Sequence, residues 1–411
     1  MLLSWIPNAA RICYLAGLYH LADGMLPSAA PLHQESDPMP PSVSPPVHQA
    51  PSQVLCARDI RRIGQGAAAA DAAGFLTPMQ QALIHRRGWL RMLAPQCAGG
   101  AEMALPAVVR LEEAIASIDA SVGWVVTLCA GAGWFAGFLP PARARDIIGT
   151  RRVCVGGSGA PTGVADRDGE GYRISGRWDY ASGAPMATHF TLNAIVREQG
   201  EPLRDSAGAA RIRAFIVPAS AVEMIPSWGS IGLRATASHS YRITDHWIGA
   251  DHGFAIDPAQ ASASGPLYRF PFLSLAYVTL AANVAGIAGH FLRLATPAIA
   301  RRRHPLSAIL LIESPAVTEC LRGAAERLES ARTHFYSLLE RAWNQVVDGC
   351  VLNADDTATL HAASLALVNA ARTAVDDLYP YCGLSAAHAR SDINRVWRDL
   401  HTATQHALLV P

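Results

Sequence analysis

The sequence predicts an α+β protein with an N-terminal helical domain, a central β-domain and a C-terminal four-helix bundle. Apolar residues recur at three- and four-residue spacing before about residue 149 and again after about residue 266. Between these stretches the segments are short, partly alternating and rich in β-branched residues, with Gly, Asp and Pro clusters separating them. At 411 residues, half of them apolar, the chain is long enough for two or three packed domains.

Residues 1–52 differ in composition from the rest of the chain. Residues 1–26 are apolar but broken by Pro and by charged side chains, and residues 27–51 are rich in Pro, Ser and His. A segment of this kind cannot bury enough apolar surface to fold alone. We therefore expect a disordered extension or a start codon assigned too far upstream. A signal peptide is the alternative, although the basic region that opens such peptides is missing.

The N-terminal helical domain is predicted over residues 53–149. Thr77 and Pro78 form an N-cap and first-turn pair that opens a helix running towards Leu93. Residues 105–118 have helical spacing, with Glu112 and Glu113 expected on the side opposite the apolar face. The next segment, residues 117–139, is apolar almost all round, so we expect it to be buried.

The central β-domain is predicted over residues 150–265. Its strand candidates follow one another too closely for helices to lie between them. They are residues 152–155, 171–175, 190–196, 212–217 and 241–247.

The C-terminal bundle, residues 266–411, is predicted to contain helices at 271–302, 315–348, 357–383 and 387–409. The first includes an uncharged run, residues 270–289, long enough to span a membrane. Polar residues and Pro271 interrupt this run, so we expect it to lie in the buried core of an oligomer, and we expect a homotetramer with no membrane partner.

Composition excludes several classes of function. The formal net charge is +1, which does not favour nucleic acid or an anionic membrane as a partner. The chain has no lysine, so a Walker-type phosphate loop and Schiff-base chemistry are excluded. The eight cysteines are scattered without a CxxC pair, which indicates reduced thiols and a cytoplasmic protein. No His, Cys or carboxylate cluster has ligand spacing, so we expect no metal.

The end of the chain carries the most specific motif. Residues 398–408 resemble the closing helix of the acyl-CoA dehydrogenase superfamily, in which an Arg-Asp pair precedes the catalytic Glu, nine residues after the Arg. Nine residues after Arg398 stands Ala407, and its neighbour is His406. This replacement resembles the superfamily's branch of two-component flavin-dependent monooxygenases. The resemblance covers residues 55–409 and implies an acyl-CoA dehydrogenase-like fold.

The same resemblance implies a flavin site in the β-domain. In residues 171–184, Ser182 takes the place of the hydroxyl residue that bonds flavin N5, and Tyr180 that of the aromatic residue against the ring. The alternative is an ordinary hairpin with Ser-Gly in its turn. Gly157 and Ser158 would present backbone N–H groups to the flavin pyrimidine carbonyls, or form a plain turn.

Further residues are assigned by the resemblance. Arg303 would contact flavin phosphate across a subunit boundary, the alternative being a solvated charge cluster at a helix C-terminus. His239, in a segment where Arg234 and Ser238 fix a loop, is a candidate for substrate contact. Trp124 and Trp134 would line a pocket that accepts aromatic groups, although core packing explains them equally well.

The last helix adds two further expectations. His401 and His406 are five residues apart and project about 140° from each other on a helix, so they cannot form a metal-binding pair. Arg395 and Asp399 are four residues apart and are expected to pair.

The function implied is that of an oxygenase component. Reduced FMN or FAD would come from a separate NAD(P)H:flavin reductase, and O₂ would add at flavin C4a. A hydroxyl would then pass to a small substrate, aromatic or heteroatom-containing, with Ser182 and His406 as catalytic residues and His406 in an acid–base role. One alternative is an acyl-CoA dehydrogenase with bound FAD whose base is Glu340 or Glu313. Another is a degenerate flavin-fold binding subunit.

Overall fold

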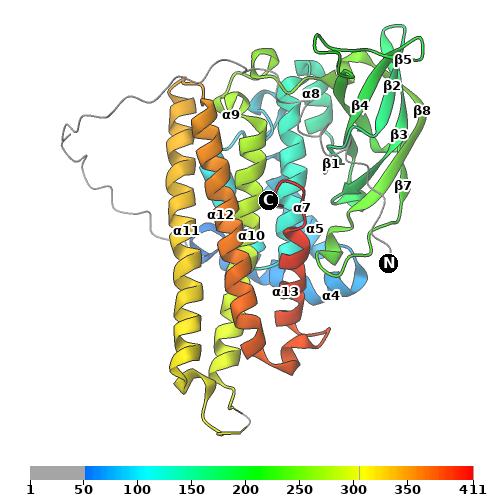
Figure 1. Ribbon diagram of the computed structural model, residues 1–411. Helices are drawn as coiled ribbons and strands as arrows, with labels where there is room; N and C mark the ends of the chain where they lie inside the picture. Colours follow the sequence, from blue (N-terminus) through cyan, green and yellow to red (C-terminus); the bar gives the residue numbers. More distant parts are fainter. Residues whose placement is uncertain (1–50, 305, 411) are drawn as a thin grey trace, which may run out of the picture.

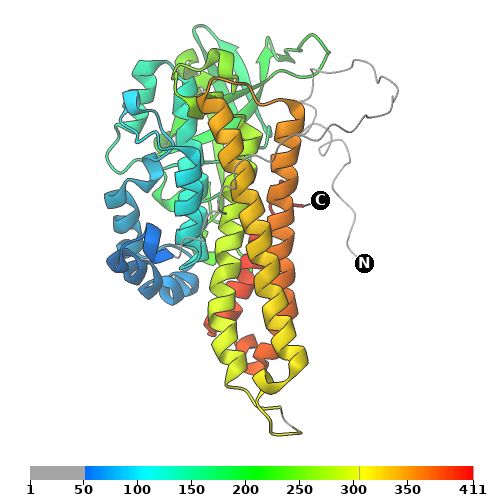
Figure 2. The same cartoon turned by 90° about the vertical axis from the view of Figure 1, so that its left-hand side faces the viewer.

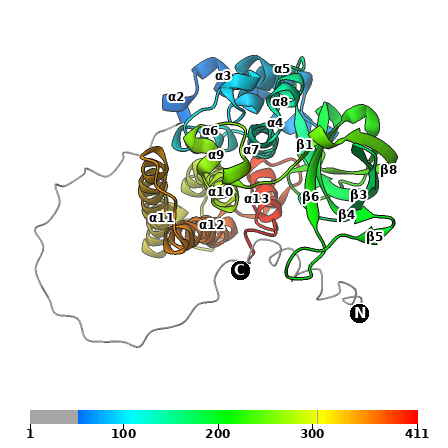
Figure 3. The same cartoon turned by 90° about the horizontal axis from the view of Figure 1, so that it is seen from above.

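The computed structural model describes residues 51–304 and 306–410, so the predictions made for the first 50 residues lie outside it. Its chain has three parts: a group of N-terminal helices, a β-sheet and a long helical bundle (Figure 1). Seen from above, helices α7 (Ala120–Trp134) and α13 (Asp392–Ala403) lie between the sheet and the outer helices of the bundle (Figure 3). The predicted α+β class, with helices before and after the sheet, is confirmed.

The N-terminal helices form where the local signals place them. Helix α5 begins at Pro78, and Thr77 caps it through a reciprocal pair of hydrogen bonds with Gln80. The α-helices of this part are α2 (Pro51–Val54), α3 (Ala57–Gln65), α4 (Ala67–Ala73), α5 (Pro78–Arg87), α6 (Leu105–Ala116), α7 and α8 (Pro141–Ile148).

The expected exposure of Glu112 and Glu113 is wrong, because both side chains are buried. Helix α6 packs against α7, α10 (Phe272–Ala300) and α11 (Pro315–Val347), so it has no broad face towards water. Glu113 is paired with Arg332 at 2.7 Å and accepts from the Tyr336 hydroxyl. The Glu112 carboxyl is fully buried, with the Thr127 hydroxyl as its neighbouring side-chain donor.

The sheet has nine strands, and its main path runs β7-β8-β3-β2-β4-β6-β9, with β1 and β5 paired to β4. Strand β3 pairs antiparallel with β8 and has an irregularity between Trp178 and Ala181. A bulge of this kind redirects side chains at the end of a strand, and Ser182 follows directly. The strands are β1 (Val155–Gly157), β2 (Gly163–Asp168), β3 (Gly171–Ala181), β4 (His189–Glu198), β5 (Glu201–Pro202), β6 (Ile212–Pro218), β7 (Glu223–Ile225), β8 (His239–Gly249) and β9 (Gly253–Phe254).

The bundle consists of α10, α11, α12 (Ala354–Cys382) and α13, preceded by the short α9 (Pro266–Arg269) (Figure 2). The last helix is shorter than predicted at both ends, since it begins at Asp392 and ends at Ala403. A 3₁₀ turn (Leu384–Ala387) precedes it, and irregular turns follow Thr404 and bury Leu409. His406 therefore lies in a turn, and the angle expected between it and His401 on one helix does not apply.

Two helical segments, Ala120–Phe138 and Phe272–Ala300, are long and apolar enough to cross a membrane. The most apolar windows of these segments are 83% and 72% buried inside the chain. Helix α10 is covered by α6, α7, α12 and α13 of the same chain. The uncharged run at 270–289 is thus buried largely within one subunit, and its contact with other subunits stays a prediction.

Candidate active site

His406 packs against an aromatic side chain of α7. Its ring centroid lies 5.9 Å from that of Trp124, in an edge-on arrangement with an interplanar angle of 65°. Burial lowers the pKa of His406 to about 4, so the imidazole is neutral at neutral pH. Its Nδ1 accepts a hydrogen bond from the Leu408 backbone N–H at 3.3 Å, and in a neutral ring the proton then resides on Nε2. The side chain is thus a neutral donor held beside an indole.

Ser182 reaches the same part of α7 from the β-domain. Its carbonyl oxygen accepts from the Cys129 thiol at 3.4 Å, and its hydroxyl lies 2.9 Å from that of Ser238. A Cβ added to Gly183 would come within 3.3 Å of Val125 Cγ1, so the turn presses directly on the helix. Helix α7 therefore contacts His406 through Trp124 and the Ser182 carbonyl through Cys129. The structure therefore brings these two predicted catalytic residues to a common element.

Tyr180 is the most exposed aromatic residue beside this turn. Its side chain is 73% exposed, and its backbone has a φ of 66°. Such a conformation is rare for a bulky residue and tends to occur at functional sites. The ring lies 6.3 Å from that of Trp228 in an edge-on contact. Trp228 was not predicted, because only the folded loop brings it next to Tyr180.

Strand β1 brings Gly156, which precedes Gly157 and Ser158, close to Ser182. A Cβ added to the preceding residue, Gly156, would lie 3.5 Å from the Ser182 carbonyl oxygen. Gly157 has a φ of 151°, and a Cβ there would clash with Thr191. The Ser158 backbone N–H donates to the Thr191 carbonyl at 3.2 Å, so this amide is not free for a flavin carbonyl as the resemblance implies.

Two further candidates already have structural partners. Trp134 is 1% exposed, donates from Nε1 to the Leu267 carbonyl at 3.0 Å and stacks on neighbouring aromatic rings, which fits core packing rather than a pocket wall. His239 accepts through Nδ1 from the backbone N–H groups of Ser227 and Trp228 at 3.2 and 3.1 Å. His239 thus fixes the loop that carries Trp228.

Arg303 lies at the opposite end of the bundle from the sheet. It follows α10 and donates to the Ala308 carbonyl at 2.8 Å. Figure 1 shows the α10–α11 connection at the bottom of the molecule and the sheet at the upper right. A contact between Arg303 and a flavin held near Ser182 would have to come from another subunit, and it stays a prediction.

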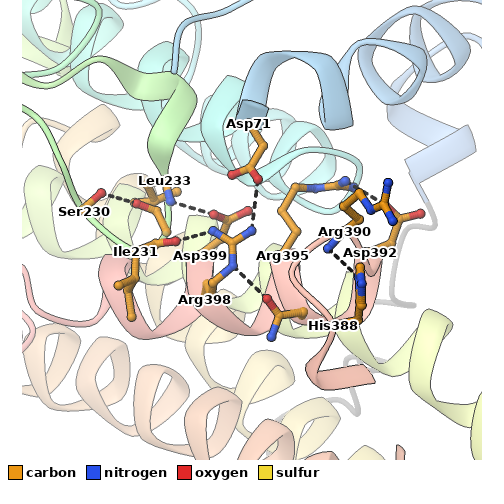
Figure 4. A network of polar contacts seen from close by, with 12 residues as sticks. Asp71, Ser230, Ile231, Leu233, His388, Arg390, Asp392, Arg395, Arg398 and Asp399 are labelled. Carbon is orange, nitrogen blue, oxygen red and sulfur yellow. Dashed lines mark hydrogen bonds and ion pairs between the residues drawn. The ribbon is translucent and has the colours of Figure 1, made fainter. Parts of the chain in front are cut away.

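The Arg398-Asp399 pair joins α13 to the rest of the protein (Figure 4). Arg398 contacts Asp71 of α4 at 3.0 Å and the Ile231 carbonyl. Asp399 accepts from the Leu233 N–H at 2.6 Å. A Cβ on Gly232 would lie 2.1 Å from the Arg398 carbonyl oxygen, which shows how closely the loop approaches the helix. Both residues therefore dock the helix that leads to His406.

The predicted pairing of Arg395 with Asp399 is wrong. Arg395 pairs with Asp392 at 2.6 Å, whereas the Asp399 carboxylate faces the Leu233 loop (Figure 4). Helical spacing allows a pair four residues apart, but a buried backbone donor occupies Asp399. Burial, together with the nearby Asp119 and Asp71, raises the pKa of Asp399 to about 7, although the Leu233 N–H and Arg395 oppose the shift.

The remaining candidate carboxylates and His401 have partners away from His406. Glu340, on α11, pairs with Arg110, and Glu313 accepts from the Leu310 N–H ahead of α11, so neither is placed as a base beside His406. His401 pairs with Asp376 at 3.0 Å. Within residues 51–304 and 306–410, no group of three His, Cys, Asp or Glu side chains could hold a metal ion.

Comparisons with known proteins found relatives that match most of the chain. Residues 278–411 match the family described as acyl-CoA dehydrogenase, C-terminal domain. Indole-3-acetate monooxygenase of Pseudomonas putida is 28% identical over 323 residues, which are 78% of this chain and 81% of that protein. The oxygenase subunit HsaA, a flavin-dependent monooxygenase of Mycobacterium tuberculosis, is 22% identical over 78% of this chain and 82% of its own length. Residues 278–411 thus match the acyl-CoA dehydrogenase C-terminal family, and the relatives that match most of the chain are monooxygenases.

The solved structures support the fold of this superfamily. XiaF from Streptomyces sp., solved in complex with FADH₂ and glycerol, superimposes with a TM-score of 0.80 at 20% identity. The superposition covers 87% of this chain and 92% of XiaF. The predicted acyl-CoA dehydrogenase-like fold is therefore confirmed. At the position where the resemblance places the dehydrogenase carboxylate, this chain has Ala407, with His406 beside it.

Proposed function

We propose that this protein is the oxygenase component of a two-component flavin-dependent monooxygenase. It would take reduced FMN or FAD from a separate NAD(P)H:flavin reductase and use O₂ to oxygenate a small aromatic or heteroatom-containing substrate. The observation that carries the proposal is the neutral, half-buried imidazole of His406, packed against Trp124 and next to Ala407, where the dehydrogenase pattern has a carboxylate. The relatives of this protein are named as monooxygenases, which supports the same proposal.

The residues near Ser182 fit a flavin. Tyr180 offers an open aromatic face for a planar ring, and the Ser182 hydroxyl can bond a ring nitrogen such as N5. When bound, reduced flavin supplies the electrons that activate O₂. The protein's own contribution is to orient the ring through Tyr180 and Ser182 and to limit the access of water.

His406 would act on the oxygen or on the substrate. As a neutral ring with its proton on Nε2, it can donate a hydrogen bond without carrying a charge into a partly dry site. Trp124 fixes the orientation of the ring and provides an apolar wall. An aromatic wall at this position supports a substrate with an aromatic or soft heteroatom group.

Flavin handling gives the first test. We expect purified protein to be nearly colourless and to bind reduced flavin more tightly than oxidised flavin in anaerobic titrations with FMN and FAD. Mixing the reduced complex with O₂ should give a transient absorbing species. Protein that purifies yellow with stoichiometric FAD, and whose flavin is reduced by an acyl-CoA, would instead be a dehydrogenase.

The role of His406 gives the second test. His406→Ala should leave the affinity for reduced flavin within a few fold, because the proposed ring contacts come from Tyr180 and Ser182. Hydroxylation should fall by roughly 10²- to 10⁴-fold, the usual effect of losing an acid–base group, and the lost turnover should appear as hydrogen peroxide. His401→Ala is the matched control, since His401 pairs with Asp376 instead. Equal effects of the two substitutions would refute the assignment.

Assembly and location complete the proposal. We propose a homotetramer in which Arg303 of one subunit reaches the flavin phosphate of another, because the α10–α11 connection that carries Arg303 and the sheet lie at opposite ends of the molecule. A cytoplasmic location is proposed from cysteine usage, and the seven cysteines within the described residues are free thiols.

A further inference from the structure

Three buried hydroxyl groups form a chain that ends at Ser182. The Ser182 and Ser238 hydroxyl oxygens are 2.9 Å apart, and those of Ser238 and Thr236 are 2.7 Å apart. The Thr236 hydroxyl also lies 2.8 Å from the Leu233 carbonyl oxygen. All three side chains are buried, with exposures of 6%, 4% and 1% for Ser182, Ser238 and Thr236. Water therefore has little access to satisfy any of them.

The direction of the hydrogen bonds follows from the last member of the chain. A carbonyl oxygen only accepts, so Thr236 donates its single hydroxyl proton to Leu233. Thr236 must then accept from Ser238, and Ser238, whose proton is thereby used, must accept from Ser182. The proton of Ser182 consequently points into the protein, and its oxygen keeps a free lone pair for a ligand.

We propose that Ser238 and Thr236 are positioning residues that set Ser182 as a hydrogen-bond acceptor and so make the site selective for reduced flavin. This inference rests on the proposed function. In reduced flavin, N5 carries a proton and can donate to the Ser182 oxygen. In oxidised flavin, N5 is only an acceptor, so Ser182 would have to turn its proton outwards.

Turning the Ser182 proton outwards disturbs all the hydrogen bonds between the three hydroxyl groups. Ser182 would lose its bond to Ser238 unless Ser238 and Thr236 both reversed, and Thr236 would then no longer donate to Leu233. The Leu233 carbonyl also accepts from the Trp228 indole N–H at 3.0 Å, so the chain ends on a loop that is itself held in place. One hydrogen bond of ordinary net strength corresponds to roughly 3- to 10-fold in affinity. The hydrogen-bonded hydroxyl groups should therefore make the affinity for reduced flavin higher than that for oxidised flavin by this factor.

The test compares the dissociation constants of oxidised and reduced FMN, and of the two forms of FAD, in anaerobic titrations. Thr236→Val replaces the hydroxyl by a methyl group of similar shape, so it should lower the ratio of oxidised to reduced dissociation constants roughly 3- to 10-fold. Thr236→Ser keeps the hydroxyl and should keep the ratio. Ser238→Ala breaks the chain at another point and should behave like Thr236→Val. The midpoint potential of bound flavin should fall in step, by about 30 mV for a tenfold change.

A matched control lies two residues from Ser238. Ser240 is also buried and its hydroxyl bonds that of Ser227 at 2.7 Å, outside the chain, so Ser240→Ala should leave the ratio unchanged. Wild-type ratios in both Thr236→Val and Ser238→Ala would overturn the inference, as would a loss in Thr236→Ser equal to that in Thr236→Val. Those outcomes leave the proposed function standing if the wild type binds reduced flavin. A wild type that binds neither FMN nor FAD in reduced form would overturn the proposed function itself, and this inference with it.

Discussion

Replacing Asp399 by Asn should change how stability depends on pH. The Asp399 carboxyl is 3% exposed and accepts from the Leu233 N–H at 2.6 Å, and burial raises its pKa to about 7 from the ordinary value of 3.8. Below about pH 3 the group is protonated in the folded and unfolded chains alike, so it adds no pH dependence. As the pH rises from about 4 to 7, the unfolded chain ionises first, and the free energy of unfolding of the wild type falls.

The size of this loss follows from the two pKa values. The difference between about 7 and 3.8 corresponds to roughly 4 kcal/mol, and the loss is complete above pH 7. Asn keeps an oxygen acceptor for Leu233 and has no charge to desolvate. The Asp399→Asn variant should therefore gain stability relative to the wild type, by up to about 4 kcal/mol, between pH 4.5 and 7.5.

Urea unfolding followed by tryptophan fluorescence at several pH values measures this difference. Asp392→Asn is the control, because that carboxylate is exposed, lies on the same helix and pairs with Arg395. It should leave the pH slope of the wild type nearly intact. Parallel profiles for Asp399→Asn and the wild type would show that the carboxyl is not held protonated, and the reasoning from burial would be refuted.

Three further changes test other parts of the structure. Glu112→Gln should stabilise the protein increasingly as the pH rises above the usual pKa of a carboxyl, because burial raises the Glu112 pKa well above normal. Thermal unfolding of the variant and the wild type at pH 5 and pH 8 measures this, and an equal difference in melting temperature at both pH values would contradict it. Arg332→Met should cost about 3–5 kcal/mol by leaving Glu113 unpaired, and adding Glu113→Leu should recover much of the loss in urea unfolding. Arg303→Ala should weaken flavin binding only in the assembled protein that light scattering identifies as a tetramer, so a monomer that binds reduced flavin normally would argue against the role of Arg303.

The order of the three parts and several element starts could be predicted from the sequence. The signals are local: Thr77 and Pro78 determine the start of α5 through the cap and a fixed φ, and closely spaced strand candidates leave no room for helices between them. The replacement of a carboxylate by Ala407, beside His406, is likewise readable in the sequence. It led to the same branch of the superfamily that the relatives indicate.

Packing between distant segments decided the rest. Helical spacing could not show that α6 has neighbours on several sides, so Glu112 and Glu113 were expected in water. It also could not show that the Asp399 carboxylate accepts a hydrogen bond from the Leu233 N–H, whereas Arg395 forms an ion pair with Asp392. These outcomes depend on which buried donor or acceptor is nearest in space, because an unsatisfied buried polar group costs more free energy than an exposed ion pair provides.

The candidate site shows the same division. The sequence by itself determined which residue types are present, including the hydroxyl of Ser182, the aromatic ring of Tyr180 and the imidazole of His406. Only the tertiary structure decided that α7 carries contacts to both Ser182 and His406, that Trp228 faces Tyr180, and that Ser238 and Thr236 orient the Ser182 hydroxyl. Local sequence sets the chemistry of a side chain, whereas its protonation state and the direction of its hydrogen bonds depend on neighbours far away along the chain.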